Sequence, residues 1–163
     1  MDTLVAIAQR YSCRSLQPVD IPPEDLENIL QAGRKAPSGM NKQPFDFLVV
    51  TKRQHIEKVA QSQAFIAGAS VLIMIAADPQ ASTYWKEDIA AAAENMLLAV
   101  TALGYGSTWV EGTILPHEDE LKQYFHVPEK YRFIIALPIG KPTAPARSTK
   151  KRPLSEMIHQ EKW

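Results

Sequence analysis

The 163-residue sequence predicts a three-layer arrangement of helices packed around a sheet. Segments with the features of helices and of short strands alternate along the chain, at irregular intervals. The run 70–77, SVLIMIAA, has the composition of a buried strand. The run 85–103 is apolar nearly all round, which is typical of a helix buried on most of its sides. In a chain of this size, such a helix lies at the centre of the core or under a partner subunit.

The first half of the chain carries recognisable start and stop signals for its elements. In 2–10, Leu4, Val5 and Ile7 are near-neighbours on one face of a short helix. Two prolines and two acidic residues open the apolar stripe of 22–34, as at many helix N-termini. The run FDFLVVT is rich in strand formers. The expected elements are helices over 2–10, 22–34 and 53–61, and strands over 45–51 and 70–77.

The second half is organised around the helix at 85–103. Gly104 is well placed to end this helix, and the glycine-rich segment after it leads into a short strand. The run YRFIIALPI predicts a strand that ends at Gly140. The remaining expected elements are a helix over 117–125, an extended tail over 141–153 and a last helical turn over 154–160. With no repeat and no linker, residues 1–163 are expected to form one domain.

Composition and charge narrow the classes of function. The 18 basic and 18 acidic residues balance, so no overall field draws the protein to nucleic acid or membrane. The longest apolar run, 65–77, is too short to span a bilayer, and the N-terminus lacks the pattern of a signal peptide. A single cysteine, Cys13, excludes an intrachain disulfide, and the four histidines show no metal-ligand spacing. We therefore expect a cytoplasmic protein with no metal site.

The segment RYSCR, residues 10–14, places Arg10, Ser12 and Arg14 two residues apart. In an extended segment, alternate side chains share one face. Two guanidinium groups and a hydroxyl on one face suit a phosphate or another planar anionic group. The alternative, a solvated surface segment, fits the composition equally well.

The stretch APSGMNKQPF, residues 36–45, joins the second helix to the first long strand. Ser38, Asn41 and Gln43 can donate and accept hydrogen bonds, and Gly39 permits close approach of the backbone. Taken alone, the stretch fits better with a turn whose polar side chains cap their own backbone.

Two further segments carry weaker signals. GYGSTWVEGTIL, residues 104–115, follows a helix and lacks the dinucleotide fingerprint, so it is either a helix stop before a strand or a backbone segment laid against a flat ligand. In the second reading, Gly112 avoids a clash with the ligand. The basic run STKKRP could bring Lys150, Lys151 and Arg152 to the same anion as Arg10, although alone it fits better with a solvated charge run.

In this order and at these intervals, the segments RYSCR, APSGMNKQPF, DIAAAAENMLLAVTALGYG, WVEG and K-x-R-P-L resemble the nitroreductase family of FMN-dependent flavoproteins. The resemblance spans nearly the whole chain. It implies an α+β fold with three α/β/α layers, a mainly antiparallel central sheet and a long central helix at the interface of an obligate homodimer. It also implies a C-terminal segment that wraps around the partner.

The resemblance also implies roles for individual residues. Arg10, Tyr11, Ser12 and Arg14 would hold the phosphate, ribityl chain and pyrimidine edge of FMN. The loop with Pro37, Ser38, Gly39, Asn41 and Gln43 would reach the FMN of the other subunit. Glu111 and Gly112 would lie beside the isoalloxazine, with a backbone N–H near flavin N5. Lys150, or Lys151 if the register slips by one, and Arg152 would close on the phosphate.

The activity implied is an NAD(P)H oxidoreductase that reduces a nitroaromatic, a quinone or a similar small acceptor by a ping-pong mechanism. The flavin would carry the chemistry, with Arg14 and the Gly112 backbone tuning it and no side chain acting as acid or base. Two features depart from the family: the short connection DPQASTY offers little cover for the active site, and Gly39 and Phe45 stand where serine and tryptophan are common. A flavin-storage module with little turnover is therefore the alternative, and an interaction protein with a basic tail ranks third.

Overall fold

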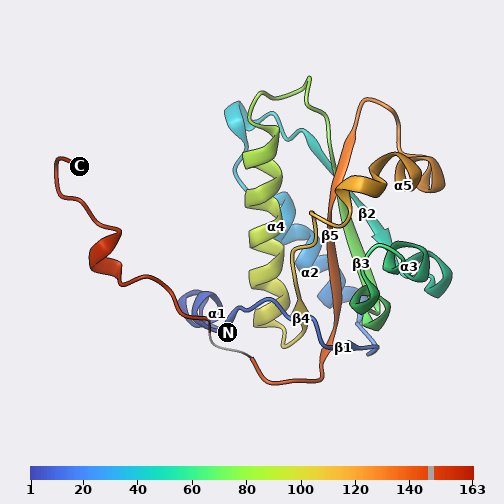
Figure 1. Cartoon of the computed structure of the whole chain (residues 1–163), viewed down its shortest axis with the longest axis horizontal. Helices are drawn as coiled ribbons and strands as arrows, with labels where there is room; N and C mark the ends of the chain where they lie inside the picture. The colour runs from blue at the N-terminus through green and yellow to red at the C-terminus, as the bar shows by residue number, and fades with distance from the viewer. Residues whose placement is uncertain (147–148) are drawn as a thin grey trace.

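The computed structural model describes residues 1–146 and 149–163, and it is built around one antiparallel sheet (Figure 1). The strands follow the order β1-β5-β3-β2, and β4 pairs with β5 beside this path. All of these pairings are antiparallel. The strands are β1 (Leu16–Gln17), β2 (Phe45–Val50), β3 (Val71–Ala77), β4 (Gly106–Ser107) and β5 (Arg132–Pro142).

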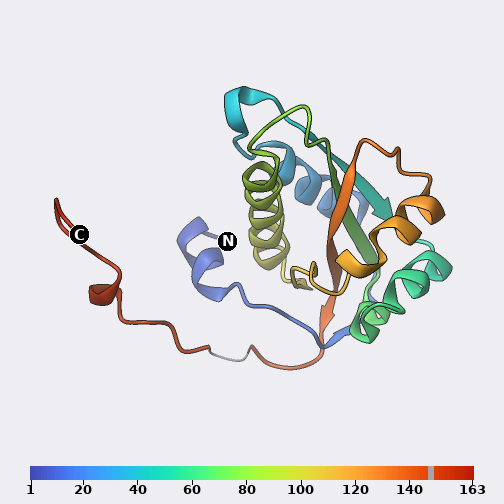
Figure 2. The ribbon, with the colours of Figure 1, turned by 45° about the horizontal axis from the view of Figure 1, so that its top comes forward.

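Helices cover both faces of the sheet (Figures 1 and 2). Helices α2 and α4 pack on one face, and α3 and α5 lie on the other. The helices are α1 (Thr3–Gln9), α2 (Pro23–Arg34), α3 (Arg53–Ala60), α4 (Trp85–Ala102) and α5 (Glu118–Phe125). Four 3-10 turns complete the elements: Gly39–Asn41, Ala64–Gly68, Leu115–His117 and Leu154–Glu156. The three layers and the α+β class are confirmed.

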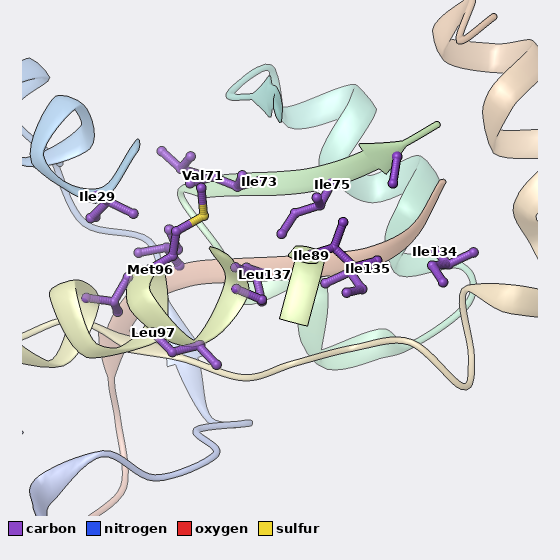
Figure 3. Packing of buried hydrophobic residues seen from close by; sticks show 14 of the residues in the cluster. Ile29, Val71, Ile73, Ile75, Ile89, Met96, Leu97, Ile134, Ile135 and Leu137 are labelled. Carbon is purple, nitrogen blue, oxygen red and sulfur yellow. The ribbon is translucent and has the colours of Figure 1, made fainter. Parts of the chain in front are cut away.

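Strand β3 is the middle of the core, because it is buried along its whole length. Alternate side chains of a strand point to opposite faces. Ile73 and Ile75 therefore pack with α2 and α4 (Figure 3), while Leu72 and Met74 pack on the side of α3 and α5. The apolar run predicted as a buried strand thus supplies both hydrophobic clusters.

Helix α4 is buried on most of its sides, as its apolar sequence predicts. Its exposed side chains are Lys86, Glu87 and Glu94. The helix ends where Gly104 takes the left-handed conformation, with a φ of 85°. By contrast, the apolar face of α1 is turned outward, since Leu4 and Ile7 are exposed and Ala6 alone is buried in this helix.

Two expectations about the elements are wrong in their bounds. Strand β5 does not end at Gly140: it continues to Pro142, because β1 pairs with its last two residues and β4 pairs beside Gly140. The last helical turn does not extend over 154–160, since it is the short 3-10 turn Leu154–Glu156. The short strand expected within 105–115 is the two-residue β4. Residues 147 and 148 of the expected extended tail lie outside the described residues.

Among the described residues, no helix combines the length and apolarity needed to cross a membrane.

Candidate functional site

The segment from Arg10 to Ser15 forms an extended strap between α1 and β1. The backbone N–H of Cys13 donates to the Ser107 carbonyl at 2.9 Å, and Thr143 N–H donates to the Ser15 carbonyl at 2.9 Å. The strap is thereby held between β4 and the end of β5. Cys13 is buried, while Ser12 and Arg14 are exposed, so the alternation expected of an extended segment is present.

Arg10 already has a partner in the single subunit. Its Nε lies 3.2 Å from Oε1 of Glu94, an exposed residue of α4. This ion pair orients the guanidinium along the central helix. Because both side chains remain accessible, an anionic ligand could share or replace Glu94 as the partner of Arg10.

Tyr11 connects the strap to the start of the C-terminal tail. Its hydroxyl donates to the Ala144 carbonyl at 3.4 Å. Burial, with a smaller contribution from Cys13, raises the pKa of the Tyr11 hydroxyl, so the group stays a neutral donor. Farther along the tail, Lys150, Lys151 and Arg152 are all exposed. The choice between Lys150 and Lys151 therefore stays open.

The loop of residues 37–43 is fixed by hydrogen bonds to itself and to the start of α4. Ser38 Oγ accepts from the Gln43 backbone N–H at 3.0 Å, and Gln43 Nε2 donates to the Asn41 carbonyl at 3.1 Å. Gly39 N–H donates to Oδ1 of Asp88 at 2.8 Å. These contacts include the self-capping that the sequence suggested, and they leave the side chain of Asn41 exposed.

The segment of residues 109–112 runs along β5. Val110 forms an antiparallel bridge with Ala136. The Trp109 indole N–H donates to Oε2 of Glu111 at 3.0 Å, which fixes the Glu111 carboxylate beside the chain. Gly112 is exposed, and a Cβ built on it would meet no atom within 4 Å. The backbone at Gly112 is therefore open to a ligand.

The predicted site residues do not all meet within one subunit. The strap and the loop of residues 37–43 lie toward opposite ends of α4 in both views (Figures 1 and 2). Arg10 reaches the middle of this helix through Glu94, whereas the loop is attached near its start through Asp88. Within one subunit, the two segments are therefore attached to different parts of α4.

The donor set fits a phosphorylated, planar ligand. Two guanidinium groups and a hydroxyl extend from the strap, and the open backbone at Gly112 suits a flat ring. Just before that segment, the hydroxyls of Ser107 and Thr108 are buried, and neither finds a hydrogen-bond partner among the described residues. Within the described residues, no cluster of three or more metal-ligating side chains is present.

Sequence reasoning did not find Asp88, Glu94 or Trp109 as members of this site. Asp88 and Glu94 lie on the same helix, and each contacts a different segment. The one available signal for Asp88 was an acidic residue in the first turn of an otherwise apolar helix.

Comparison with known proteins agrees with this fold. A model of the nitroreductase family matches residues 7–64 and 57–141. A relative from Archaeoglobus fulgidus named "Putative NADH dehydrogenase/NAD(P)H nitroreductase" is 34% identical over 174 residues, covering 99% of each chain. A relative of the same name from Methanothermobacter thermautotrophicus is 32% identical and covers 100% of this chain and 88% of its own length.

Solved structures of nitroreductases have the same fold as this chain. The crystal structure of a protein of that name from Bacteroides thetaiotaomicron superimposes with a TM-score of 0.90 and 28% identity, covering 99% of this chain and 98% of that one. The structure of "a putative nitroreductase in complex with FMN" from Desulfovibrio desulfuricans gives a TM-score of 0.87 and 31% identity, covering 100% and 98% of the two chains. The chain is therefore an oxidoreductase of the nitroreductase family.

Proposed function

We propose that this protein is an FMN-dependent oxidoreductase that uses NADH or NADPH to reduce a small electron-poor acceptor such as a nitroaromatic or a quinone. The observation that carries the proposal is the strap, which presents Arg10, Ser12 and Arg14 away from the buried Cys13. The FMN complex of the Desulfovibrio relative, at 31% identity over the whole chain, supports the choice of cofactor.

The strap would bind the anionic end of the cofactor. Arg10 would give up part of its contact with Glu94 to a phosphate oxygen, with which a guanidinium can form paired hydrogen bonds. Ser12 would donate to the ribityl chain, and Tyr11 would hold the strap against the start of the tail. Arg14 would lie near the pyrimidine edge, where a fixed positive charge favours negative charge on the reduced ring.

The open backbone at Glu111 and Gly112 would lie against the ring system. Bound FMN would supply the redox chemistry, with hydride entering from NADH or NADPH and electrons leaving to the acceptor. The chain's own residues would bind and orient the ring, and none of them is needed as a general acid or base. Since donor and acceptor would use the same open face in turn, we expect ping-pong kinetics.

A homodimer is part of the proposal, because the loop of residues 37–43 and the strap lie toward opposite ends of α4 within one subunit. The partner would supply Pro37, Ser38, Gly39, Asn41 and Gln43. The exposed apolar residues support an interface: Leu4 and Ile7 on α1, and Leu154 and Met157 in a tail that is exposed along residues 149–163.

The tail would also complete the phosphate site. Its exposed Lys150, or Lys151, and Arg152 would add charge beside Arg10. We treat residues 1–163 as one FMN-binding domain. We place the protein in the cytoplasm, since a fold with one cysteine and no intrachain disulfide is usual in a reducing compartment.

The decisive test is flavin binding by the purified protein. We expect a yellow protein with one FMN per subunit, and at least tenfold weaker FMN binding in Arg10→Ala, because that change removes a charged hydrogen-bond donor from the phosphate. Arg53→Ala is the matched control: Arg53 is likewise paired with a glutamate, but it lies on α3. A colourless protein that does not bind added FMN would contradict the proposal.

A flavin-storage module with little turnover is favoured by one feature. Only seven residues, 78–84, connect β3 to α4, and they form no helix that could cover an active site. Stopped-flow mixing of the FMN-loaded protein with NADH or NADPH separates the two functions. Loss of flavin absorbance on the timescale of turnover supports the enzyme, and unchanged absorbance supports storage.

A further inference from the structure

The loop of residues 37–43 has an unusual backbone. Met40, Asn41 and Gln43 have positive φ angles of 52°, 54° and 47°. Side-chain-bearing residues seldom adopt this left-handed conformation, and a loop with three of them needs external support. The glycine of the loop does not relieve this cost, since Gly39 is not among the positive-φ residues. Gly39 is needed for space instead, because a Cβ there would lie 2.5 Å from Cδ2 of Tyr84.

The support comes from a buried carboxylate in α4. Asp88 is only 3% exposed. Its Oδ1 accepts the Gly39 backbone N–H at 2.8 Å, and its Oδ2 accepts the Ser82 hydroxyl at 2.9 Å. Ser82 is itself 1% exposed, and its Oγ accepts the Tyr84 backbone N–H at 3.1 Å. The carboxylate therefore ties the loop to the segment that leads into α4.

The loop is closed at its other end by its own residues. Ser38 Oγ accepts the Gln43 N–H, and Asn41 N–H donates to the Ser38 carbonyl at 2.9 Å. These local bonds set the shape of the loop, whereas the bond from Gly39 to Asp88 sets its place on the subunit. Position matters here, because a loop that serves another subunit's ligand must present Asn41 at a defined distance from the helix at the interface.

We propose that Asp88 is a positioning residue for flavin binding: it holds the strained loop in the one place from which Asn41 can reach the FMN of the partner subunit. This inference rests on the proposed function and adds to it a buried residue that itself touches no ligand. Pre-organisation of this kind lowers the cost of ordering the loop when the cofactor binds.

The test compares Asp88→Ala with Glu87→Ala, the neighbouring exposed residue of the same helical turn. FMN affinity is measured by titrating the apoprotein dimer, and hydrogen exchange is followed at the backbone amides of Gly39 and Gln43. We expect Asp88→Ala to raise the Kd for FMN at least tenfold and to accelerate exchange at Gly39 at least tenfold, with the dimer retained. We expect Glu87→Ala to leave both within twofold of wild type.

Two milder variants cover the case in which Asp88→Ala does not fold. Asp88→Asn keeps an oxygen that can accept from Gly39, so it should retain FMN affinity within about threefold. Ser82→Ala removes the second partner of the carboxylate and should give an intermediate loss, with faster exchange at Gly39.

The outcomes separate this inference from the proposed function. If wild-type protein binds no FMN, the proposed function and this inference fail together. If Arg10→Ala weakens FMN binding but a folded Asp88→Ala dimer, or failing that Ser82→Ala, keeps wild-type affinity, only the role of Asp88 is overturned. A structural role alone would lower thermal stability and leave the Kd unchanged.

Discussion

The carboxylate of Glu118 accepts several hydrogen bonds. It lies on the opposite side of the sheet from the candidate site. Its oxygens accept hydrogen bonds from Nε and Nη2 of Arg132 and, at 2.7 Å, from the backbone N–H of Phe133. Burial by itself would raise the pKa of this carboxyl. The hydrogen bonds from Arg132 and Phe133 outweigh that effect and hold the pKa below its usual value.

The lowered pKa leads to a prediction about stability and pH. Glu118→Gln should lower the free energy of unfolding at pH 7 by about 2 kcal/mol, because an amide N–H replaces an oxygen that accepts charged hydrogen bonds. A carboxyl with a depressed folded-state pKa stabilises the fold above its unfolded-state pKa, roughly 4.3. The difference between variant and wild type should therefore be constant above about pH 5 and shrink as the pH falls further.

Urea unfolding at a series of pH values measures this effect. Glu57→Gln serves as the control, because Glu57 forms an exposed i,i+4 pair with Arg53 and should contribute no more than about 0.5 kcal/mol. If the free energy of unfolding of Glu118→Gln is lower than that of wild type by the same amount at every pH, the side chain acts through packing rather than charge.

At the residue scale, local spacing in the sequence indicates candidate ligand-binding residues, but it does not indicate the residues that hold them in place. Arg10, Ser12 and Arg14 could be picked out because their spacing of two is visible locally and implies a shared face. The partners of the loop and of Arg10 could not be found this way. Asp88 meets Gly39 across 49 residues, and such contacts depend on the packing of α4, which no local pattern encodes.

At the scale of elements, long and strongly patterned segments were predicted well. The helix expected over 85–103 is α4, and the strand expected over 70–77 is β3. Strands β1 and β4 have two residues each, too few to show a period of two, and the extension of β5 to Pro142 depends on pairing with them. These short pairings hold the strap, so the part of the fold that positions the site was the least predictable.

Substitution of Gly68 tests whether its close packing against β1 holds the strap in place. A Cβ on this residue would lie 2.2 Å from the Leu16 carbonyl oxygen in β1, a backbone atom that cannot rotate away. Gly68→Ala should therefore lower the free energy of unfolding by about 2 kcal/mol, within the range of other overpacked sites. It should also weaken FMN binding, since β1 directly follows the strap. Urea unfolding and flavin titration measure the two effects.

For stability, the matched control is Gly112→Ala, where a Cβ would meet nothing within 4 Å. This variant should unfold like wild type and lose FMN affinity only if the ring lies against residue 112. A Gly68→Ala protein with wild-type stability would mean that β1 moves freely, and the strap would then not be anchored by this close approach.

At the scale of the whole molecule, the single subunit leaves much apolar surface uncovered. Trp163 is 100% exposed and Leu154 is 70% exposed in the tail, which runs away from the body of the subunit (Figure 2). A groove of about 420 Å³ lies between α2 and the edge strand β2, lined in part by Leu30, Phe45 and Phe47. Gln31, Arg34, Gln43 and Asp46 also line this groove, so the support for the proposed dimer comes from the exposed apolar side chains of the tail.

The shared site of that dimer can be tested by mixing subunits. Arg10→Ala and Asn41→Ala should each weaken FMN binding as homodimers, because each removes a proposed contact from both sites. If the loop acts on the partner's flavin, a mixed dimer of the two variants has one site with both changes and one site with neither. Half of its sites should then bind FMN with wild-type affinity, measured by flavin titration of tagged, purified mixed dimers. If each loop serves its own subunit, every site carries one change and no high-affinity site appears.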